Sequence, residues 1–437
     1  MQPAILDKLR GLVGGAHALT GIELSSYVVE GRTPDVAVFP GSVDEVQSVV
    51  ALAAETETPL VPWGGGTAAT VGTPPARTGI VLGLARLDRL VEHEPGDLTA
   101  TVQAGMTVER FQTALRKRGQ WLSLDPSDAD RATLGGVVAA NASGPRRHLY
   151  GTVRDQLIGI TVVTAEGALV RGGGKVVKNV AGYDLPKLFV GSYGTLGVIV
   201  ELTVRLRPLP ETERWMRVRF DHLKDAGVAV RAIMGADLIA TAIELLDAEA
   251  SRALGLEGTP TLLVAFDGLP EQVDWQCTEL AAVTTPLGGP SVAPLPDAAV
   301  LRPEPAWMSA RGLVAIMRFS VLPALVTELM EHGAGAARQR GLQAAWIAHA
   351  GVGVVTAALF STSDRPELKT VAAVLAEWRS LARSGGGHAT LEWAPLAVKA
   401  QTPVWEDLGA AGRVMQRIKA QLDPKGILNP GRFVAGI

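Results

Sequence analysis

Three glycine-rich segments, each beside β-branched or apolar residues, constrain this chain more than any other feature of its sequence. They span residues 63–68 (WGGGTA), 133–144 and 178–199. Successive glycines allow positive φ values and let backbone N–H groups converge on an anion. One such segment is weak support, because glycine also marks ordinary tight turns. The ordered set of three glycine-rich turns predicts a backbone that approaches a large phosphate-bearing ligand.

Two common phosphate-binding motifs do not fit the first segment. A P-loop needs Lys followed by Ser or Thr, and this pair is missing after Gly66. A Rossmann fingerprint needs a helix directly after the turn and an acidic residue about 20 positions further on, and we predict neither. A tight turn without a ligand stays the alternative for this segment.

Length and hydropathy predict a compact protein without a membrane span. The chain has 437 residues, enough for two or three domains, and 47% of them are hydrophobic. Its apolar stretches fall short of the roughly 20 residues that a spanning helix needs. Charged residues at Asp7, Lys8 and Arg10 interrupt the N-terminus, unlike a secretory signal. We expect a cytoplasmic protein that reaches the inner membrane only through partners.

Charge and cysteine usage limit the partners. The net charge is −3, with 41 basic and 44 acidic residues mixed along the chain, so we expect no nucleic-acid partner. Cys277 is the one cysteine, which excludes an internal disulfide. It also excludes an iron–sulfur cluster held by this chain, because such clusters need several thiolates. Any iron–sulfur centre that takes electrons from this protein belongs to another subunit.

The order of predicted elements indicates an α+β protein. A strand at 34–40, a helix at 43–55 with Ser42 as N-cap and a strand at 58–62 lead into the first glycine turn. Further strands are predicted at 80–84, 99–103 and 157–164, and a helix at 108–118. After residues 207–211, Ala-rich helices alternate with apolar strands, and this alternation predicts an antiparallel α+β region. Residues 284–305 within it are predicted to be a loop. The predicted helices are 225–235, 323–341, 367–384 and 402–422, and the strands are 261–266, 313–320, 344–350 and 352–360.

Six motifs together resemble the vanillyl-alcohol-oxidase-type (PCMH-type) FAD-binding flavoproteins. They are Pro40 with the following SVDEV, GGGT at 64–67, TLGG at 133–136, KNVAGYD at 178–184, GTLGVI at 194–199 and ILNPGR at 427–432. Within this family the chain is similar to the FAD-binding subunits of glycolate oxidases (glycolate dehydrogenases). The resemblance implies a two-lobed FAD-binding domain (1–210), an antiparallel α+β cap domain (211–400) and a C-terminal segment (401–437) that packs back on the FAD domain.

The resemblance also implies which residues bind FAD. Backbone amides of residues 64–68 would hold the diphosphate, Gly197 to Ile199 would contact the adenine half, and Asn429 would close over the isoalloxazine. Thr67 stands where some relatives carry a His bonded to flavin, so the resemblance implies non-covalent FAD. The implied residues are Trp63, Gly64, Gly65, Gly66, Thr67, Ala68, Pro126, Thr133, Gly135, Gly136, Ala139, Asn141, Ser143, Gly144, Gly197, Val198, Ile199 and Asn429.

Catalytic relatives that oxidise 2-hydroxy acids carry H-x-G-D-G-N-x-H, and then E-H-G-x-G, around a divalent metal. Here the first motif reads His349-Ala-Gly-Val-Gly-Val-Val-Thr356, and the second begins Glu392-Trp393. Val352 and Val354 replace the Asp and Asn, and both of the later imidazoles are lost. One His and one Glu hold a metal weakly, so we predict no metal site.

Four residues remain weak catalytic candidates, each with a structural alternative. His349 could be a base or a strand histidine satisfied by its packing, and Glu392 could be a metal ligand. Lys399 could stabilise reduced flavin or be a solvated lysine. Arg318 could bind a carboxylate or form a salt bridge.

The resemblance leaves three functions open. The first is an FAD-binding redox subunit of a glycolate (2-hydroxy acid) oxidase complex, with a catalytic flavoprotein subunit and an iron–sulfur subunit as partners. The second is a self-sufficient FAD-dependent 2-hydroxy-acid dehydrogenase, which Thr356 and Trp393 disfavour. The third is a structural subunit with non-catalytic FAD.

Overall fold

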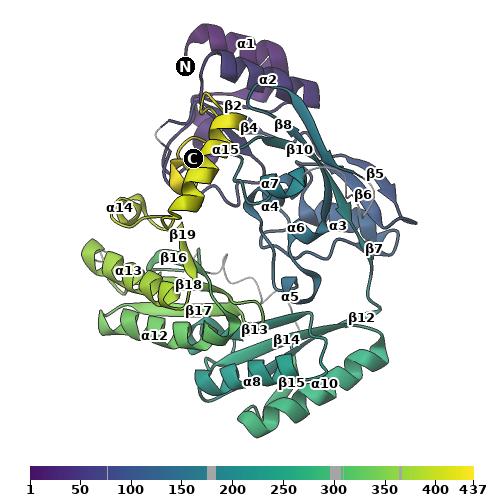
Figure 1. The fold of residues 1–437 in the computed structure, drawn as a ribbon, viewed down its shortest axis with the longest axis vertical. Coiled ribbons are helices and arrows are strands. Elements are labelled where there is room, and N and C mark those ends of the chain that lie inside the picture. Colours follow the sequence, from purple (N-terminus) through teal and green to yellow (C-terminus); the bar gives the residue numbers. More distant parts are fainter. Residues whose placement is uncertain (76, 175–183, 296–306, 309, 364–366) are drawn as a thin grey trace. The chain divides into compact units, whose positions relative to one another are not determined.

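The computed structural model describes residues 1–437 except 76, 175–183, 296–306, 309 and 364–366 (Figure 1). The chain forms two compact units. The first unit comprises Met1–Gly144, Gly151–Leu209 and Asp407–Ile437, and the second comprises Pro145–Tyr150 and Pro210–Glu406. The motif at 178–184 lies outside the described residues apart from Asp184, as does much of the predicted loop at 284–305.

A four-stranded sheet opens the first unit. Its order is β1 (Ala18–Leu19), β2 (Val36–Val38), β4 (Ile80–Gly83) and β3 (Leu60–Trp63), and β2, β4 and β3 run parallel. Helix α2 (Val43–Glu55) begins as predicted. Ser42 Oγ accepts from the Glu45 amide at 3.2 Å, and the Glu45 carboxylate accepts from the Gly41 amide at 2.7 Å. These two bonds satisfy N–H groups that a helix start leaves open.

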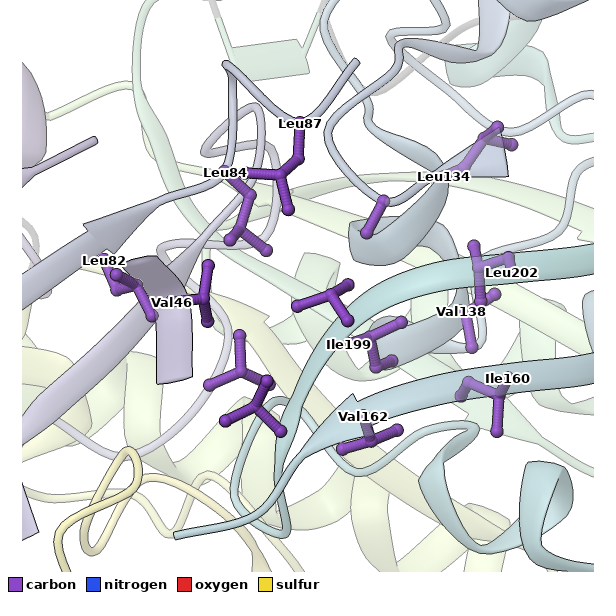
Figure 2. Close-up of a cluster of buried hydrophobic side chains, with 14 of the residues drawn as sticks. Val46, Leu82, Leu84, Leu87, Leu134, Val138, Ile160, Val162, Ile199 and Leu202 are labelled. Atoms are coloured by element: carbon purple, nitrogen blue, oxygen red, sulfur yellow. The ribbon is translucent and has the colours of Figure 1, made fainter. Parts of the chain in front are cut away.

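A five-stranded antiparallel sheet completes the first unit. Its order is β5 (Leu90–Glu94), β6 (Thr99–Gln103), β10 (Val198–Arg205), β8 (Leu157–Val163) and β9 (Leu169–Gly173). One apolar core joins both sheets, and Figure 2 shows part of it: Val46 of α2 and Leu82 of β4 belong to the same cluster as Val162 and Ile199. The core therefore holds the loops that follow β3 and precede β10 on one rigid base.

Short elements fill the rest of the first unit. They are α1 (Pro3–Val13), α3 (Val108–Arg116), β7 (Gln120–Trp121), α4 (Leu134–Ala140), α6 (Val153–Gln156), α7 (Leu185–Phe189), β11 (Arg207–Pro208) and α15 (Ala410–Leu422), with 3₁₀ turns at Gly15–His17, Gly21–Tyr27 and Val434–Gly436. The C-terminal helix α15 is drawn in yellow in Figure 1. No described helix is long and apolar enough to cross a membrane.

The second unit is built on an eight-stranded antiparallel sheet, which confirms the predicted α+β character. The strand order is β15 (Ser291–Pro294), β12 (Thr212–Arg219), β14 (Thr261–Gly268), β13 (Ala242–Leu246), β17 (Gln343–His349), β18 (Val354–Phe360), β16 (Leu313–Ser320) and β19 (His388–Trp393). The helices are α5 (Arg147–Tyr150), α8 (Leu223–Gly235), α9 (Ala248–Ala253), α10 (Pro270–Thr284), α12 (Val326–Gln339), α13 (Leu368–Ser384) and α14 (Leu396–Lys399), with 3₁₀ turns at Thr285–Leu287 and Pro323–Leu325.

Apolar side chains on one face of this sheet pack against its long helices. Trp346 of β17 lies 4.7 Å, ring centroid to centroid, from Trp378 of α13, and Phe319 of β16 stacks on Trp346. The opposite face carries a second apolar cluster together with Glu244, His349, Thr356 and Arg318, because residues in register on neighbouring antiparallel strands share a face.

Three predictions from the sequence need correction. The second glycine segment is not a turn throughout: Leu134–Ala140 is helix α4, because Thr133 caps it and Gly135 packs directly on Ala104. The predicted helix at 402–422 begins only at Ala410, after Pro403 and a positive φ of 53° at Gly409. The segment at 284–305 is not a loop throughout, because Ser291–Pro294 is strand β15, which pairs with β12. Among the described helices and strands of the second unit, eight were not predicted from the sequence, namely β12, β13, β15, β19, α5, α9, α10 and α14.

Candidate functional site

The turn after β3 presents a row of backbone donors. Within the described residues, the N–H groups of Gly65, Gly66, Thr67 and Ala68 have no acceptor. The turn closes with bonds from the Ala69 amide to the Gly66 carbonyl, at 3.2 Å, and from the Val71 amide to the Ala68 carbonyl, at 3.1 Å. Gly66 has a φ of 73°. Successive open amides of this kind form an anion site.

The glycines of this turn are required by the protein as well as by a ligand. A Cβ on Gly64 would lie 2.2 Å from Thr133 Oγ1, and one on Gly65 would lie 1.8 Å from the Arg131 carbonyl oxygen. The turn therefore packs directly on residues 131–133. This reason for the glycines was not foreseen from the sequence, which pointed only to the space beside an anion.

Most of the small residues expected to line the flavin also serve packing. Thr133 Oγ1 accepts from the Gly136 amide at 3.2 Å, and Ser143 Oγ accepts from the Val153 amide at 3.1 Å. A Cβ on Gly144 would lie 1.9 Å from the Asp125 carbonyl oxygen. Pro126 is buried. Gly136 and Asn141 are exposed, and Ala139 and Trp63 are half-buried.

The third glycine turn is bonded to the end of α4. The Gly191 amide donates to the Val138 carbonyl at 3.0 Å, and the Tyr193 amide donates to the Ala139 carbonyl at 2.9 Å. The first and third turns therefore lie against the two ends of one segment, 131–139. Gly197, Val198 and Ile199 are buried, with both valine and isoleucine side chains in the core, so only their backbone could reach a ligand.

The C-terminal motif joins the same site. The Asn429 amide donates to the Leu60 carbonyl at 2.8 Å, and its Nδ2 donates to the Tyr193 carbonyl at 2.7 Å. Asn429 is 6% exposed, and its Oδ1 is buried without a partner in the described residues. A buried amide oxygen without a donor costs about 1–3 kcal/mol. A ligand N–H would remove that cost.

Three charged residues hold the C-terminal segment to the first unit, and their contacts were not predicted from the sequence. Arg432 Nη2 donates to the Ala69 carbonyl at 2.8 Å and to the Val71 carbonyl, and burial lowers the pKa of Arg432 to about 10. Lys419 Nζ contacts Asp423 Oδ2 at 2.6 Å and the carbonyls of Thr195 and Leu428. The i, i+4 spacing of Lys419 and Asp423 was the one available signal.

These observations fit FAD. The four open amides suit a diphosphate, the unpartnered Asn429 Oδ1 suits a ring N–H, and the glycine-rich turns leave the backbone accessible. When bound, FAD supplies a ring that accepts and releases electrons. The groups of the first unit that would hold it are the backbone amides of the β3 turn and the Asn429 side chain.

The second unit holds three of the four weak catalytic candidates in two ion pairs. His349 Nδ1 lies 2.8 Å from both carboxylate oxygens of Glu244, whose side chain is 1% exposed. Arg318 Nη1 lies 3.2 Å from Glu392 Oε1. The strand register places Glu244 opposite His349 and Arg318 opposite Thr356. Both members of each pair therefore lie on strands of the same sheet.

The other positions of the altered motifs are apolar or buried. Val354 pairs with His349 in the sheet, and Trp393 packs against the apolar cluster of that face. Lys399 is 7% exposed, so the interpretation as a solvated lysine is wrong. Among the described residues, no group of three or more His, Cys, Asp or Glu could hold a metal ion.

Comparisons with known proteins place this chain among flavoproteins. Residues 34–173 match the FAD binding domain model, and residues 209–433 match the model of FAD linked oxidases, C-terminal domain. Glycolate oxidase subunit GlcD of Bacillus subtilis is 30% identical, over 92% of this chain and 89% of that protein. D-lactate dehydrogenase of Archaeoglobus fulgidus is 30% identical, over 91% of each. The solved structure of p-cresol methylhydroxylase is 18% identical with a TM-score of 0.82, covering 99% and 96% of the two chains, which shows the PCMH-type fold.

Proposed function

Because this chain belongs to the family of FAD-linked oxidases, we propose that it is the FAD-binding redox subunit of a complex that oxidises glycolate or a similar 2-hydroxy acid. In this role it passes electrons to an iron–sulfur partner, beside a catalytic flavoprotein subunit. The single cysteine supports a partner for the iron–sulfur step, because such clusters need several thiolates.

The two ion pairs of the second unit carry the proposal. A substrate carboxylate would have to displace Glu392 from Arg318, and a proton acceptor role for His349 would compete with Glu244. Thr356 and Trp393 offer no imidazole in exchange. Of these side chains only Glu244 is fully buried, at 1% exposed, and removing a partner from a buried charge costs several kcal/mol. These positions are therefore better suited to holding the sheet together than to binding a hydroxy acid.

Within this proposal the residues of the first unit bind the cofactor. The open amides of the β3 turn bind the diphosphate, and Asn429 orients the flavin ring by one hydrogen bond. No residue of the chain needs to take a proton from the substrate.

A second candidate function is direct oxidation of a 2-hydroxy acid by this chain alone. Its support is the similarity, over nine-tenths of the chain, to a protein named D-lactate dehydrogenase. The two functions differ in one property, which is whether the isolated chain transfers electrons from a hydroxy acid to its own flavin.

Anaerobic titration of the isolated FAD-loaded chain separates them. Glycolate and D-lactate should leave the flavin absorbance unchanged, with or without Mn²⁺ or Zn²⁺, whereas dithionite should bleach it. Glycolate-dependent dye reduction should appear only after a catalytic flavoprotein subunit and an iron–sulfur subunit are added. Steady dye reduction by this chain alone, above that of free FAD, would refute the subunit role and support the self-sufficient enzyme.

A further inference from the structure

Two arginines from different segments contact the turn after β3, and their bonding differs. Arg432 is buried, and its guanidinium is used on the carbonyls of Ala69 and Val71. Arg131 is exposed, and its Nη2 makes one long bond of 3.4 Å to the Gly65 carbonyl. Among the described residues, no carboxylate lies within ion-pair distance of Arg131.

A second exposed arginine in an adjoining segment, Arg110, does have a carboxylate partner. Arg110, the third residue of α3, forms an ion pair with Asp88 at 2.5 Å. The residues that precede α4 are bonded to the start of α3, because the Val108 amide donates to the Ala132 carbonyl at 2.9 Å. Arg110 and Arg131 therefore belong to adjoining segments of the first unit, but only Arg110 has its charge balanced by a carboxylate in the described part of the chain.

The backbone of Arg131 is held against the turn. Its carbonyl oxygen occupies the space that a Cβ of Gly65 would need, 1.8 Å away. The side chain bonds to the carbonyl of the same glycine. The guanidinium therefore contacts the same turn that carries the open amides of residues 65–68, and most of its five donors remain available.

We propose that Arg131 is the cation that recognises the FAD diphosphate, together with the amides of the turn. Neutral amides orient a diphosphate but leave its negative charge unbalanced, whereas a planar guanidinium bonds two phosphate oxygens at once. Arg432 acts differently, since it shapes the turn through two carbonyls. The assignment gives the chain a selectivity for flavin dinucleotide over flavin without phosphate, and it does not depend on the substrate or partner proposed above.

Titration of the full-length apoprotein with FAD and with riboflavin tests this assignment. R131Q should weaken FAD binding about 10-fold, the size expected for a charge-assisted bond, and leave riboflavin binding unchanged. The dissociation constant for FAD should rise with salt more steeply in the wild type than in R131Q, because salt screens an exposed charge. R131K should lose less affinity than R131Q, because lysine keeps the charge and loses only the planar fork. R110Q should match the wild type.

The same titrations can overturn the assignment. Unchanged FAD affinity in R131Q, an equal loss for riboflavin, or a loss in R131K as large as in R131Q would each refute a diphosphate contact. Thermal melting of each apoprotein checks the fold. If R131Q melts several degrees lower, R131K replaces it in the test. The assignment is then judged by the salt dependence of FAD binding to R131K and by the affinities of R131K for FAD and riboflavin.

Discussion

At the scale of single residues, the β3 turn depends on the absence of a Cβ atom at its glycines. A Cβ at Gly65 would overlap a backbone carbonyl, and backbone cannot move aside as a flexible side chain can. Gly65→Val should therefore displace the turn from residues 131–133 and lower FAD affinity by more than 100-fold, equivalent to about 3 kcal/mol. The ratio of flavin to protein absorbance after purification measures the loss.

Gly96→Val is the matched control for this substitution. Gly96 lies in the same unit, and nothing stands within 4 Å of the position that a Cβ would take there. The variant should keep its flavin. Full flavin occupancy in Gly65→Val would show that the anion site lies elsewhere.

At the scale of elements, Asp247 is a helix cap with an unusual titration. Its carboxylate accepts from the Ala250 amide at 2.7 Å at the start of α9, and burial raises the pKa of Asp247 to about 7. The folded protein therefore holds this proton more tightly than the unfolded chain. The free energy of unfolding should fall as pH rises from about 4 to about 7 and stay low above that.

Asp247→Asn should remove this pH dependence, because the amide oxygen still caps the helix but no longer ionises. At pH 8 we expect the variant to be more stable by about 1–2 kcal/mol, a value that allows for the loss of the charge–dipole interaction. Urea unfolding between pH 5 and pH 8.5 measures the difference. Glu271→Gln is the control, because Glu271 is an exposed acid in the first turn of α10, and this variant should leave the profile unchanged. An Asp247→Asn variant less stable than the wild type at pH 8 would contradict the buried titration.

At the scale of the whole molecule, we predict from one position in the turn that FAD is bound without a covalent bond. Thr67 is exposed there, and a threonine hydroxyl offers no nucleophilic nitrogen for a bond to flavin. Acid precipitation of the purified protein should therefore release all yellow colour into the supernatant. Colour retained in the pellet, as a covalent flavoprotein would show in parallel, would contradict non-covalent binding.

The sequence alone was enough to predict those elements whose signals are local. Hydrophobic runs placed β6, β14 and β16, and the Ser42 and Glu45 pair placed the start of α2, because such signals lie within a few residues. The glycine motifs also indicated an FAD-binding flavoprotein. By contrast, β13 and α10 were not predicted and α4 was expected to be a turn, since short buried elements carry little periodicity of their own.

The tertiary structure decided which groups meet. Arg131 and Gly65 are 66 residues apart, Arg318 and Glu392 are 74 apart, and Lys419 and Thr195 are 224 apart. No local rule predicts such pairs, because sheet register and loop packing bring them together. The sequence by itself predicted an FAD-binding flavoprotein, which the family models confirm. Only the fold decided that Gly65 packs on the Arg131 backbone, that His349 faces a buried carboxylate, and that the Arg131 side chain contacts the β3 turn.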